Sequence, residues 1–246
     1  MGKLPLVKLV NIHKWFGRVS ALEGVDLSAD YNEIVGLVGD NGAGKSTLIK
    51  ILSGVYSPDK GEIRWEGKKI NFSSPKNAIK LGIETIHQEA ALVDNMNIMR
   101  NIFIGREPVI RFGPMGWLNM KKMASESMRA LEGVALYLRS PQALVEELSG
   151  GQRQGVAIAR AMYFKTKLLV LDEPTNNLSV KESKRILRSV TELKEQGISS
   201  IFITHNLYHV YPIADRIVVL SHGKKVGEFK KEETSIDDLT ELITLK

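Results

Sequence analysis

Two glycine-containing turns in this sequence, each followed by a predicted helix, have the residue types that bind phosphate. The first is Gly39–Thr47 (GDNGAGKST), and the second lies near the start of Glu147–Ala161 (ELSGGQRQGVAIARA). Helix N-termini behind glycine turns bind anions, because unpaired backbone N–H groups and the helix dipole point at the ligand. The sequence therefore predicts two anion sites roughly a hundred residues apart. The second site binds either another phosphate of this chain or a phosphate that belongs to another chain.

The first turn matches a nucleotide-binding pattern. Gly39–Ser46 fits GxxxxGKS/T, follows the apolar segment Ile34–Val38 (IVGLV), predicted as a buried strand, and opens a helix predicted from Lys45 to Ser53. In such a loop the backbone amides surround phosphate oxygens, Lys45 reaches the β- and γ-phosphates, and Ser46 offers its hydroxyl to Mg²⁺. The predicted nucleotide-binding residues of this loop are Gly39, Asp40, Asn41, Gly42, Ala43, Gly44, Lys45, Ser46 and Thr47.

Two acidic residues follow another apolar segment, LLVLD, which ends at Asp172. A carboxylate at the carboxyl end of a buried parallel strand lies beside the phosphate loop of such a sheet, which suits Asp172 as a Mg²⁺ ligand. Adjacent side chains at a strand end point in different directions, so Glu173 is free to serve the attacking water. The alternative is a pair of surface acids in the turn before Pro174.

With the addition of Leu148–Gln152 (LSGGQ), the set of motifs resembles the ATP-binding subunit of ABC transporters. The phosphate loop, LSGGQ, LLVLDEPT and ITH occur in that family's order and spacing, over nearly the whole chain. The resemblance implies ATP as the nucleotide and a head-to-tail dimer of two subunits. It also implies that Ser149, Gly150, Gly151 and Gln152 of one subunit cap the γ-phosphate bound by the other. The alternative is a serine-capped helix without a ligand, which by itself gives no reason for two glycines.

Three further site residues are implied by the resemblance alone. Phe16, in KWFG, matches the aromatic residue that stacks on adenine. Its neighbour Trp15 is the rival candidate for this role, and a place in the hydrophobic core is the alternative for either ring. Gln88, in IHQE, matches the glutamine that senses Mg²⁺ and the attacking water, and His205, in ITHN, matches the histidine that contacts the γ-phosphate. The implied catalytic residues are Glu173, His205, Gln88 and Lys45, and the implied metal-binding residues are Ser46, Gln88 and Asp172. For His87 and His209 we expect structural roles.

The sequence departs from the family pattern after the DEPT run. Many family members have S-A-L-D there, whereas this chain has Asn176-Asn177-Leu178-Ser179, so the acid at the dimer interface is absent. Ser179 is instead suited to cap the next helix, with Glu182 completing a capping box. Glu173 is retained, and we therefore expect a working ATPase.

The elements that position these residues follow an α/β pattern. Short strand signals dominate the first part of the chain, helical spacing prevails from about Ala91 to Phe164, and strand signals then return at Leu168–Leu171 and Ser199–Ile203. Pro108–Trp117 is rich in Gly and Pro and is predicted as a loop, and Met120–Leu138 is predicted as helical. The expected fold is a P-loop NTPase core with a mixed sheet, an N-terminal antiparallel β-subdomain and an inserted α-helical subdomain. We expect a single ABC ATPase domain, 1–246, with a core formed by 1–90 and 165–246 and a helical subdomain at 91–164.

Composition limits the class of protein. The 246 residues are 43% hydrophobic, enough for a substantial core, and the absence of cysteine excludes disulfides and is compatible with a cytosolic setting. No stretch approaches the roughly 18 consecutive apolar residues of a membrane span, and the N-terminal segment does not resemble a signal peptide. The net charge of +6 would suit a nucleic-acid or anionic-membrane partner. Because the basic residues are dispersed, a solvated basic surface is the simpler interpretation, and no nucleic acid is expected.

A finer resemblance concerns the transported compound. The segment GIETIHQEAALVDNMNIMRNIFIGRE resembles the ATPases of simple-sugar importers. Many of these fuse two ATPase halves, whereas this chain has one set of motifs, which implies a homodimer. Transmembrane permease subunits, and indirectly an extracytoplasmic substrate-binding protein, are the implied partners, at the cytoplasmic face of the membrane. The alternatives are an exporter or another cargo class, or a soluble ABC ATPase that acts on ribosomes or nucleic acid.

Overall fold

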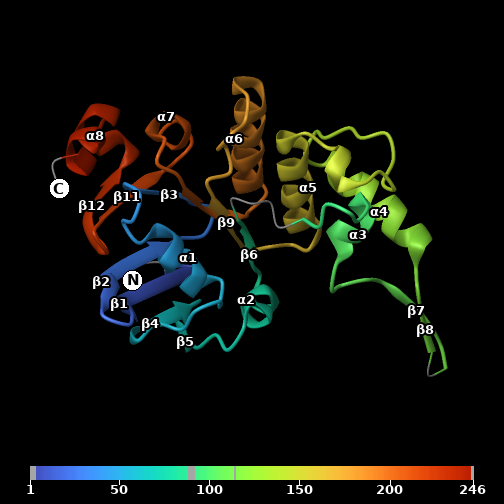
Figure 1. Cartoon of the computed structure of the whole chain (residues 1–246), viewed down its shortest axis with the longest axis horizontal. Coiled ribbons are helices and arrows are strands. Elements are labelled where there is room, and N and C mark those ends of the chain that lie inside the picture. Colours follow the sequence, from blue (N-terminus) through green and yellow to red (C-terminus); the bar gives the residue numbers. More distant parts are fainter. Residues whose placement is uncertain (1–3, 88–91, 114, 245–246) are drawn as a thin grey trace. The chain divides into compact units, whose positions relative to one another are not determined.

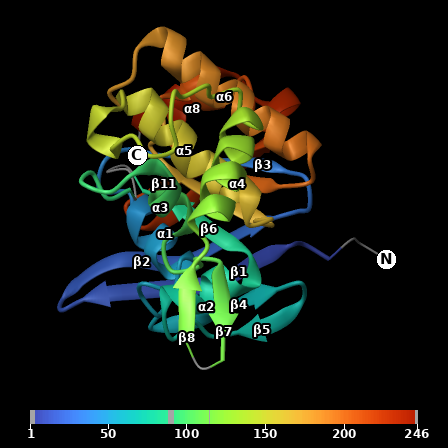
Figure 2. The ribbon, with the colours of Figure 1, turned by 90° about the vertical axis from the view of Figure 1, so that its right-hand side faces the viewer.

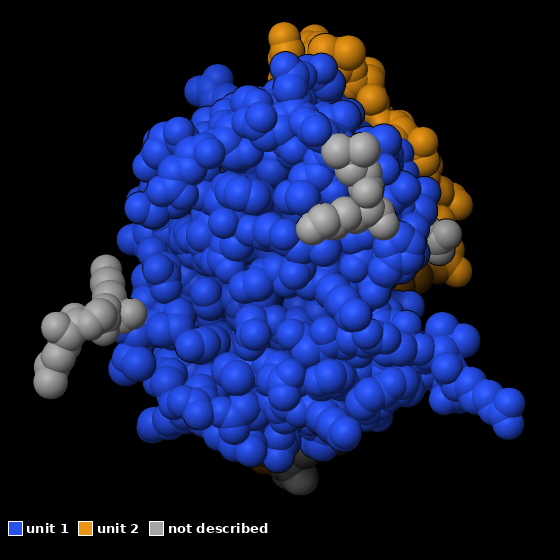
Figure 3. Space-filling model, turned by 90° about the vertical axis from the view of Figure 1, so that its left-hand side faces the viewer, with its two compact units in different colours: residues 1–88, 166–176, 187–246 blue, residues 89–165, 177–186 orange. Residues whose placement is uncertain are grey.

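The computed structural model describes residues 4–87, 92–113 and 115–244, which fold into two compact units (Figures 1 and 3). The first unit comprises residues 1–88, 166–176 and 187–246, and the second comprises residues 89–165 and 177–186. Helix α6 (Val180–Glu195) contributes residues to both units. Among the described residues, no helix has both the length and the apolar character needed to cross a bilayer.

A six-stranded sheet forms the centre of the first unit. Its strands, in spatial order, are β12 (Lys224–Lys230), β11 (Arg216–Ser221), β3 (Ile34–Val38), β10 (Ser199–Ile203), β9 (Leu168–Asp172) and β6 (Ile83–Ile86). All neighbouring pairs are parallel except β11 with β12. β3 and β10 are buried along their whole length, which suits the continuous apolar run of β3 and the apolar second half of β10. Because β3, β9 and β10 run in the same direction, the residues that follow their carboxyl ends gather at one edge of the sheet.

A second, antiparallel sheet belongs to the same unit. Its strands, in spatial order, are β2 (Val19–Ala29), β1 (Val7–Phe16), β4 (Lys60–Trp65) and β5 (Lys68–Ile70). β1 and β2 form a hairpin whose turn uses Gly17 at φ +60°, a conformation that glycine adopts without steric cost. Buried side chains of this sheet, including Leu9 and Val25, join those of α1 (Lys45–Leu52) and the central sheet in one apolar cluster. The first unit therefore has a continuous core beneath the loop that follows β3.

Three further helices belong to the first unit. α2 (Pro75–Leu81) has proline at its first position and Gly82 at φ +92° after its last, which is the favoured arrangement. α7 (Leu207–Val210) and α8 (Ile236–Thr244) follow β10 and β12, with a short 3-10 turn at Lys231–Glu233 before α8.

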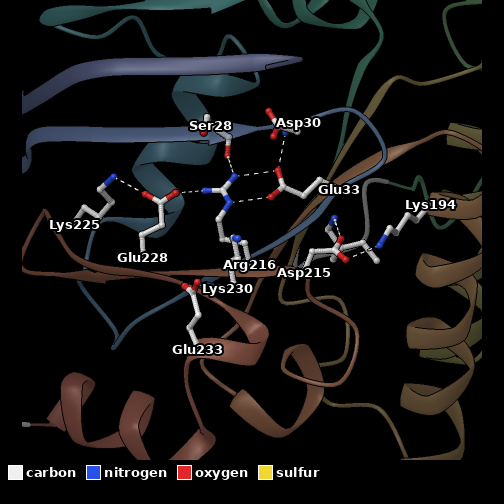
Figure 4. A network of polar contacts seen from close by, with 11 residues as sticks. Ser28, Asp30, Glu33, Lys194, Asp215, Arg216, Lys225, Glu228, Lys230 and Glu233 are labelled. Carbon is white, nitrogen blue, oxygen red and sulfur yellow. Dashed lines mark hydrogen bonds and ion pairs between the residues drawn. The ribbon is translucent and has the colours of Figure 1, made fainter. Parts of the chain in front are cut away.

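A half-buried ion pair joins the amino-terminal ends of β3 and β11, opposite the carboxyl edge of the sheet (Figure 4). The guanidinium of Arg216 donates to both carboxylate oxygens of Glu33, at 2.9 and 3.0 Å, and to the backbone carbonyl of Ser28 at 2.8 Å. It also contacts Glu228, which is held in turn by Lys225. Bidentate pairs of this kind are strong and geometrically specific, so Arg216 ties the two strands and β2 together.

The second unit is mainly helical. It contains α3 (Ile98–Phe103), α4 (Met120–Glu132), a 3-10 turn (Val145–Glu147), α5 (Gly150–Tyr163) and the first turns of α6. Asn101 is fully buried, and its amide donates to the carbonyls of Val93, Met96 and Asn97, so it fixes the chain that precedes α3. The ring of Phe103 packs edge-on against Tyr163 and Phe164.

Two predictions for this region are wrong. The loop expected at Pro108–Trp117 contains a hairpin of β7 (Val109–Phe112) and β8 (Met115–Leu118), visible in Figure 2. Val109 pairs with Leu118 and Ile110 with Trp117, so β-branched and aromatic residues oppose each other across the strands and outweigh the loop signal of the glycines. The helix expected over Met120–Leu138 stops at Glu132, because Gly133 closes it and its N–H bonds back to Arg129.

Candidate functional site

The loop after β3 is built so that its backbone can surround an anion. Gly39 has φ +147°, and a Cβ there would lie 2.1 Å from the carbonyl oxygen of Leu220, so only glycine fits. Gly44 has φ +100° and is the N-cap of α1, and no side chain caps this helix or places an acid in its first turn. The first N–H groups of α1 are therefore available to a ligand, and the helix dipole favours a negative one.

Lys45 is the cation of this loop. Its side chain is buried, and its ammonium donates to the carbonyl oxygens of Gly39 at 2.7 Å and Asp40 at 2.9 Å. Burial lowers the pKa of Lys45, although the nearby carboxylates of Glu173 and Asp172 favour its charged form. The loop thus holds a poorly solvated ammonium beside an uncapped helix start, which favours an anionic ligand.

A cavity of about 290 Å³ brings the phosphate loop and the two acids together. It is lined by Val19, Ser20, Ala21, Asn41, Gly42, Ala43, Gly44, Lys45, Ser46, Thr47, Asp172 and Glu173. Two segments separated by more than a hundred residues thus meet in one hollow, as the strand-end argument predicts. A larger cavity, of about 590 Å³, lies beside Arg216 at the opposite end of the strands and contains none of the predicted site residues.

The fit of a magnesium ion depends on Ser46 and Asp172. Burial raises the pKa of Asp172, Glu173 adds to this effect, and the charges of His87 and Lys45 oppose it. Among the described residues, the Asp172 carboxylate makes no hydrogen bond or ion pair, and no cluster of three or more His, Cys, Asp or Glu side chains has metal-binding geometry. A hydroxyl and an unpaired carboxylate in one cavity fit Mg²⁺, which takes one or two protein oxygens and completes its shell with water and phosphate.

Glu173 is held by the end of β10. Its Oε2 accepts a hydrogen bond from the Thr204 hydroxyl at 2.9 Å, and its Oε1 accepts one from the backbone N–H of His205 at 3.1 Å. The ring nitrogen Nδ1 of His205 lies 2.8 Å from the same Oε1. Glu173 also has φ +50°, an uncommon conformation for a residue other than glycine. Strained backbone of this kind persists where surrounding bonds enforce it, and it clusters at functional sites.

The LSGGQ segment lies in the second unit and begins α5. Ser149 is the N-cap: its hydroxyl oxygen accepts from the Gln152 N–H at 3.2 Å, and the Gln152 side chain accepts from the Ser149 N–H at 2.9 Å. The Ser149 hydroxyl also donates to Glu182 at 2.9 Å. A Cβ at Gly150 would lie 3.0 Å from Leu178 Cδ2, and one at Gly151 would lie 2.7 Å from Glu182 Cγ. Close packing against Leu178 and Glu182 is thus a second reason for glycine at these two positions, beside a ligand.

Three further predictions concern the adenine-stacking ring, Gln88 and the capping box of α6. Phe16 is 43% exposed and packs edge-on against Tyr56 at 5.3 Å, whereas the half-buried Trp15 stacks on His13, so Phe16 presents the freer ring. Gln88 lies outside the described residues, and its role stays a prediction. The capping box is confirmed, since the Ser179 hydroxyl accepts from the Glu182 N–H at 3.3 Å and Glu182 accepts from the Ser179 N–H at 3.1 Å.

Two contacts of these residues were not predicted: that of Thr204 with Glu173 and that of Glu182 with Ser149. The position of Thr204, at the carboxyl end of a buried strand and next to the predicted His205, is the sequence signal that indicates the first contact. The two histidines expected to be structural are half-buried, and His209 bonds the Thr175 hydroxyl at 2.9 Å.

Comparison with known proteins agrees with this geometry. The family model described as ABC transporter matches residues 22–176. The xylose/arabinose import ATP-binding protein of Sulfolobus acidocaldarius is 47% identical over 97% of this chain and 94% of that protein. The fructose import ATP-binding protein of Rhizobium meliloti is 40% identical over 99% of this chain and 95% of that protein.

Solved structures match nearly the whole chain at lower sequence identity. An ATP-binding cassette of an ABC transporter in its ADP conformation has a TM-score of 0.82 and 27% identity, over 98% of this chain and 95% of that one. A dimeric ATP-binding cassette in a post-hydrolysis state, bound to ADP and phosphate, has a TM-score of 0.77 and 27% identity, over 92% of this chain and 98% of that one. The fold predicted from the sequence is confirmed.

Proposed function

This chain belongs to the ABC transporter family of ATP-binding proteins, and on that premise we propose that it hydrolyses ATP to drive the import of a simple sugar. The observation that supports ATP hydrolysis most directly is the cavity in which the uncapped start of α1, Lys45, Asp172 and Glu173 meet. The sugar as cargo is supported by the relatives, which are sugar-import proteins at 47% and 40% identity over nearly full length.

The phosphates of ATP bind the loop through its backbone. Glycines at positive φ let the backbone of the loop curve around a phosphate, and the dipole of α1 adds to the attraction. The ammonium of Lys45 exchanges its bonds to the carbonyls of Gly39 and Asp40 for phosphate oxygens, because a full negative charge attracts it more strongly than a carbonyl dipole. The adenine stacks on the exposed ring of Phe16.

Ser46 and Asp172 would hold the magnesium ion, and Gln88 is a third predicted contact. Bound there, the ion would neutralise negative charge on the phosphates. The protein contributes an unpaired carboxylate whose raised pKa reflects a burial penalty, which a bound cation relieves.

Glu173 is the residue that serves the attacking water. Its carboxylate lines the cavity, and the Thr204 hydroxyl and the His205 N–H fix its orientation. A carboxylate held in this way orients a water molecule and accepts its proton as the oxygen attacks the γ-phosphate. His205, whose ring lies beside Glu173, contacts the γ-phosphate.

The functional unit is a homodimer on the cytoplasmic face of a membrane. In it, Ser149, Gly150 and Gly151 of each subunit face the γ-phosphate of the ATP that the other subunit binds, so twofold symmetry creates two composite sites. Dimerisation is supported by the related cassette whose structure is dimeric. ATP closes the dimer, hydrolysis opens it, and the motion is transmitted to transmembrane permease subunits that receive sugar from an extracytoplasmic binding protein.

Affinity purification of the tagged chain from its native membranes tests this function. A polytopic permease and an external sugar-binding protein are expected to co-purify, and the binding protein is then screened against simple sugars. The matched control is a Lys45→Ala chain, which keeps its surface and is expected to retain the permease while losing ATP hydrolysis. Recovery of ribosomes, DNA or no membrane protein would leave the ATPase assignment in place and refute the transport function.

A further inference from the structure

The N-terminus of α5 already binds an anion in this structure, and the anion is a side chain of the same chain. Glu182, in the first turn of α6, directs its carboxylate at the signature turn formed by Ser149, Gly150 and Gly151. The Ser149 hydroxyl donates to Oε1 at 2.9 Å. A Cβ built on Gly151 would lie 2.8 Å from Oε1, so the glycine permits this close approach.

The other carboxylate oxygen is anchored to the start of α6. Oε2 of Glu182 accepts from the Ser179 hydroxyl at 2.8 Å and from the Ser179 N–H at 3.1 Å. Hydrogen bonds from Ser179, then Ser149, and then the backbone N–H groups of Ser179 and Gly151 lower the pKa of Glu182 to about 2. Because donors to a carboxylate stabilise its charged form, Glu182 is a fixed negative charge at the signature turn at every physiological pH.

The Ser149 hydroxyl cannot donate to two anions at once. It has one hydrogen, which goes to Glu182, and its oxygen already accepts from the Gln152 N–H at 3.2 Å. A phosphate that takes this hydrogen removes it from Glu182, and two negative charges at one turn also repel each other.

We propose that Glu182 is an internal competitor of the γ-phosphate, which occupies the signature turn until ATP bound by the other subunit displaces it. The inference rests on the proposed function, in which this turn faces the γ-phosphate of the partner subunit. Displacement breaks the bond from Ser149 but leaves those from Ser179, so Glu182 stays close to the turn. The competition raises the ATP concentration at which the dimer closes, and the return of the carboxylate favours reopening after hydrolysis.

The test measures ATP-dependent dimerisation in the full chain with Glu173→Gln, which keeps bound ATP intact. Glu182→Gln is added to remove the competing charge, and Glu195→Gln, at an exposed position in the last turn of α6, is the matched control. The dimer fraction is followed against ATP concentration by analytical ultracentrifugation. Glu182→Gln is expected to lower the half-maximal ATP concentration by about tenfold, which corresponds to about 1.4 kcal/mol, while Glu195→Gln leaves it unchanged. An unchanged or higher ATP requirement in Glu182→Gln overturns the proposal.

A second measurement does not depend on how well Glu182→Gln folds. In an experimental structure of the ATP-bound Glu173→Gln dimer, the Ser149 hydroxyl is expected to bond the phosphate, with Glu182 beyond hydrogen-bonding distance. A bond retained between Ser149 and Glu182 overturns the competition. If Glu173→Gln stays monomeric at saturating ATP, the proposed dimer itself is wrong and the inference falls with it. If it dimerises normally and ignores the Glu182 change, only the inference is wrong.

Discussion

Thr204→Val tests how Glu173 is positioned. Thr204 is 1% exposed, and its hydroxyl donates to Glu173 Oε2 at 2.9 Å and accepts from the Asn206 N–H at 3.0 Å. Valine has nearly the same shape but lacks the hydroxyl, so the carboxylate loses one of the donors that orient it. A hydrogen bond to a charged group contributes about 1.5–3 kcal/mol. If that energy is lost in the transition state, in which the water attacks the γ-phosphate, kcat falls roughly 10- to 150-fold.

The assay is steady-state phosphate release as a function of ATP concentration. KM for ATP is expected to change little, because the bonds of Thr204 involve neither the phosphate loop nor Lys45. Thr204→Ser is the control, since it keeps the hydroxyl and should retain most of the parent kcat. Thr204→Val also leaves the Asn206 N–H without its acceptor, so thermal unfolding must show that the valine variant is folded at the assay temperature. A kcat within twofold of the parent, or a serine variant as slow as the valine variant, would refute this role for Thr204.

Three further outcomes are expected. Glu173→Gln should nearly abolish phosphate release while ATP binding, measured by equilibrium dialysis, is retained; turnover at the parent rate would show that Glu173 is not the base. Asp172→Asn should weaken Mg²⁺-dependent nucleotide binding, and it should raise the melting temperature of the nucleotide-free protein at neutral pH. Burial raises the pKa of Asp172, so the charged carboxylate destabilises the folded state at pH values above that pKa. This destabilisation disappears as the pH falls through the pKa, and the neutral asparagine side chain removes it at neutral pH. An unchanged or lower melting temperature would contradict this. Arg216→Ala should lower the free energy of unfolding in urea by about 1.5–3 kcal/mol, because the half-buried Glu33 loses its bidentate partner; a loss below about 1 kcal/mol would show that the pair contributes little.

Local signals account for the parts of the site that the sequence predicted. A glycine loop between a buried strand and a helix is a contiguous feature, so the motif Gly39–Ser46 specifies both the turn and the start of α1. Likewise, the acids after β9 have a known place once that strand is parallel to β3. The strands Ile34–Val38 and Ser199–Ile203 have the predicted bounds, because each is short and is followed directly by a glycine or a polar residue.

The β7–β8 hairpin marks where local signals mislead. Gly and Pro in residues 108–117 indicate a loop, and Gly113 does adopt a turn conformation at φ +59°. On either side of it, however, Val109 pairs with Leu118 and Ile110 with Trp117. Pairing energy between strands depends on which side chains oppose each other, and a propensity summed along the chain does not contain it.

The sequence by itself determined the family, the phosphate loop and the identity of the acids, since each depends on residue type at short spacing. The tertiary structure decided which side chains hold those groups in place. Thr204 bonds Glu173 across 31 positions, and Glu182 reaches Ser149 across 33. Contacts at such separations form when parallel strands align their ends or when two helices meet at their N-termini. The orientation of Glu173 and the position of the Glu182 carboxylate beside Ser149 therefore follow only from the folded chain.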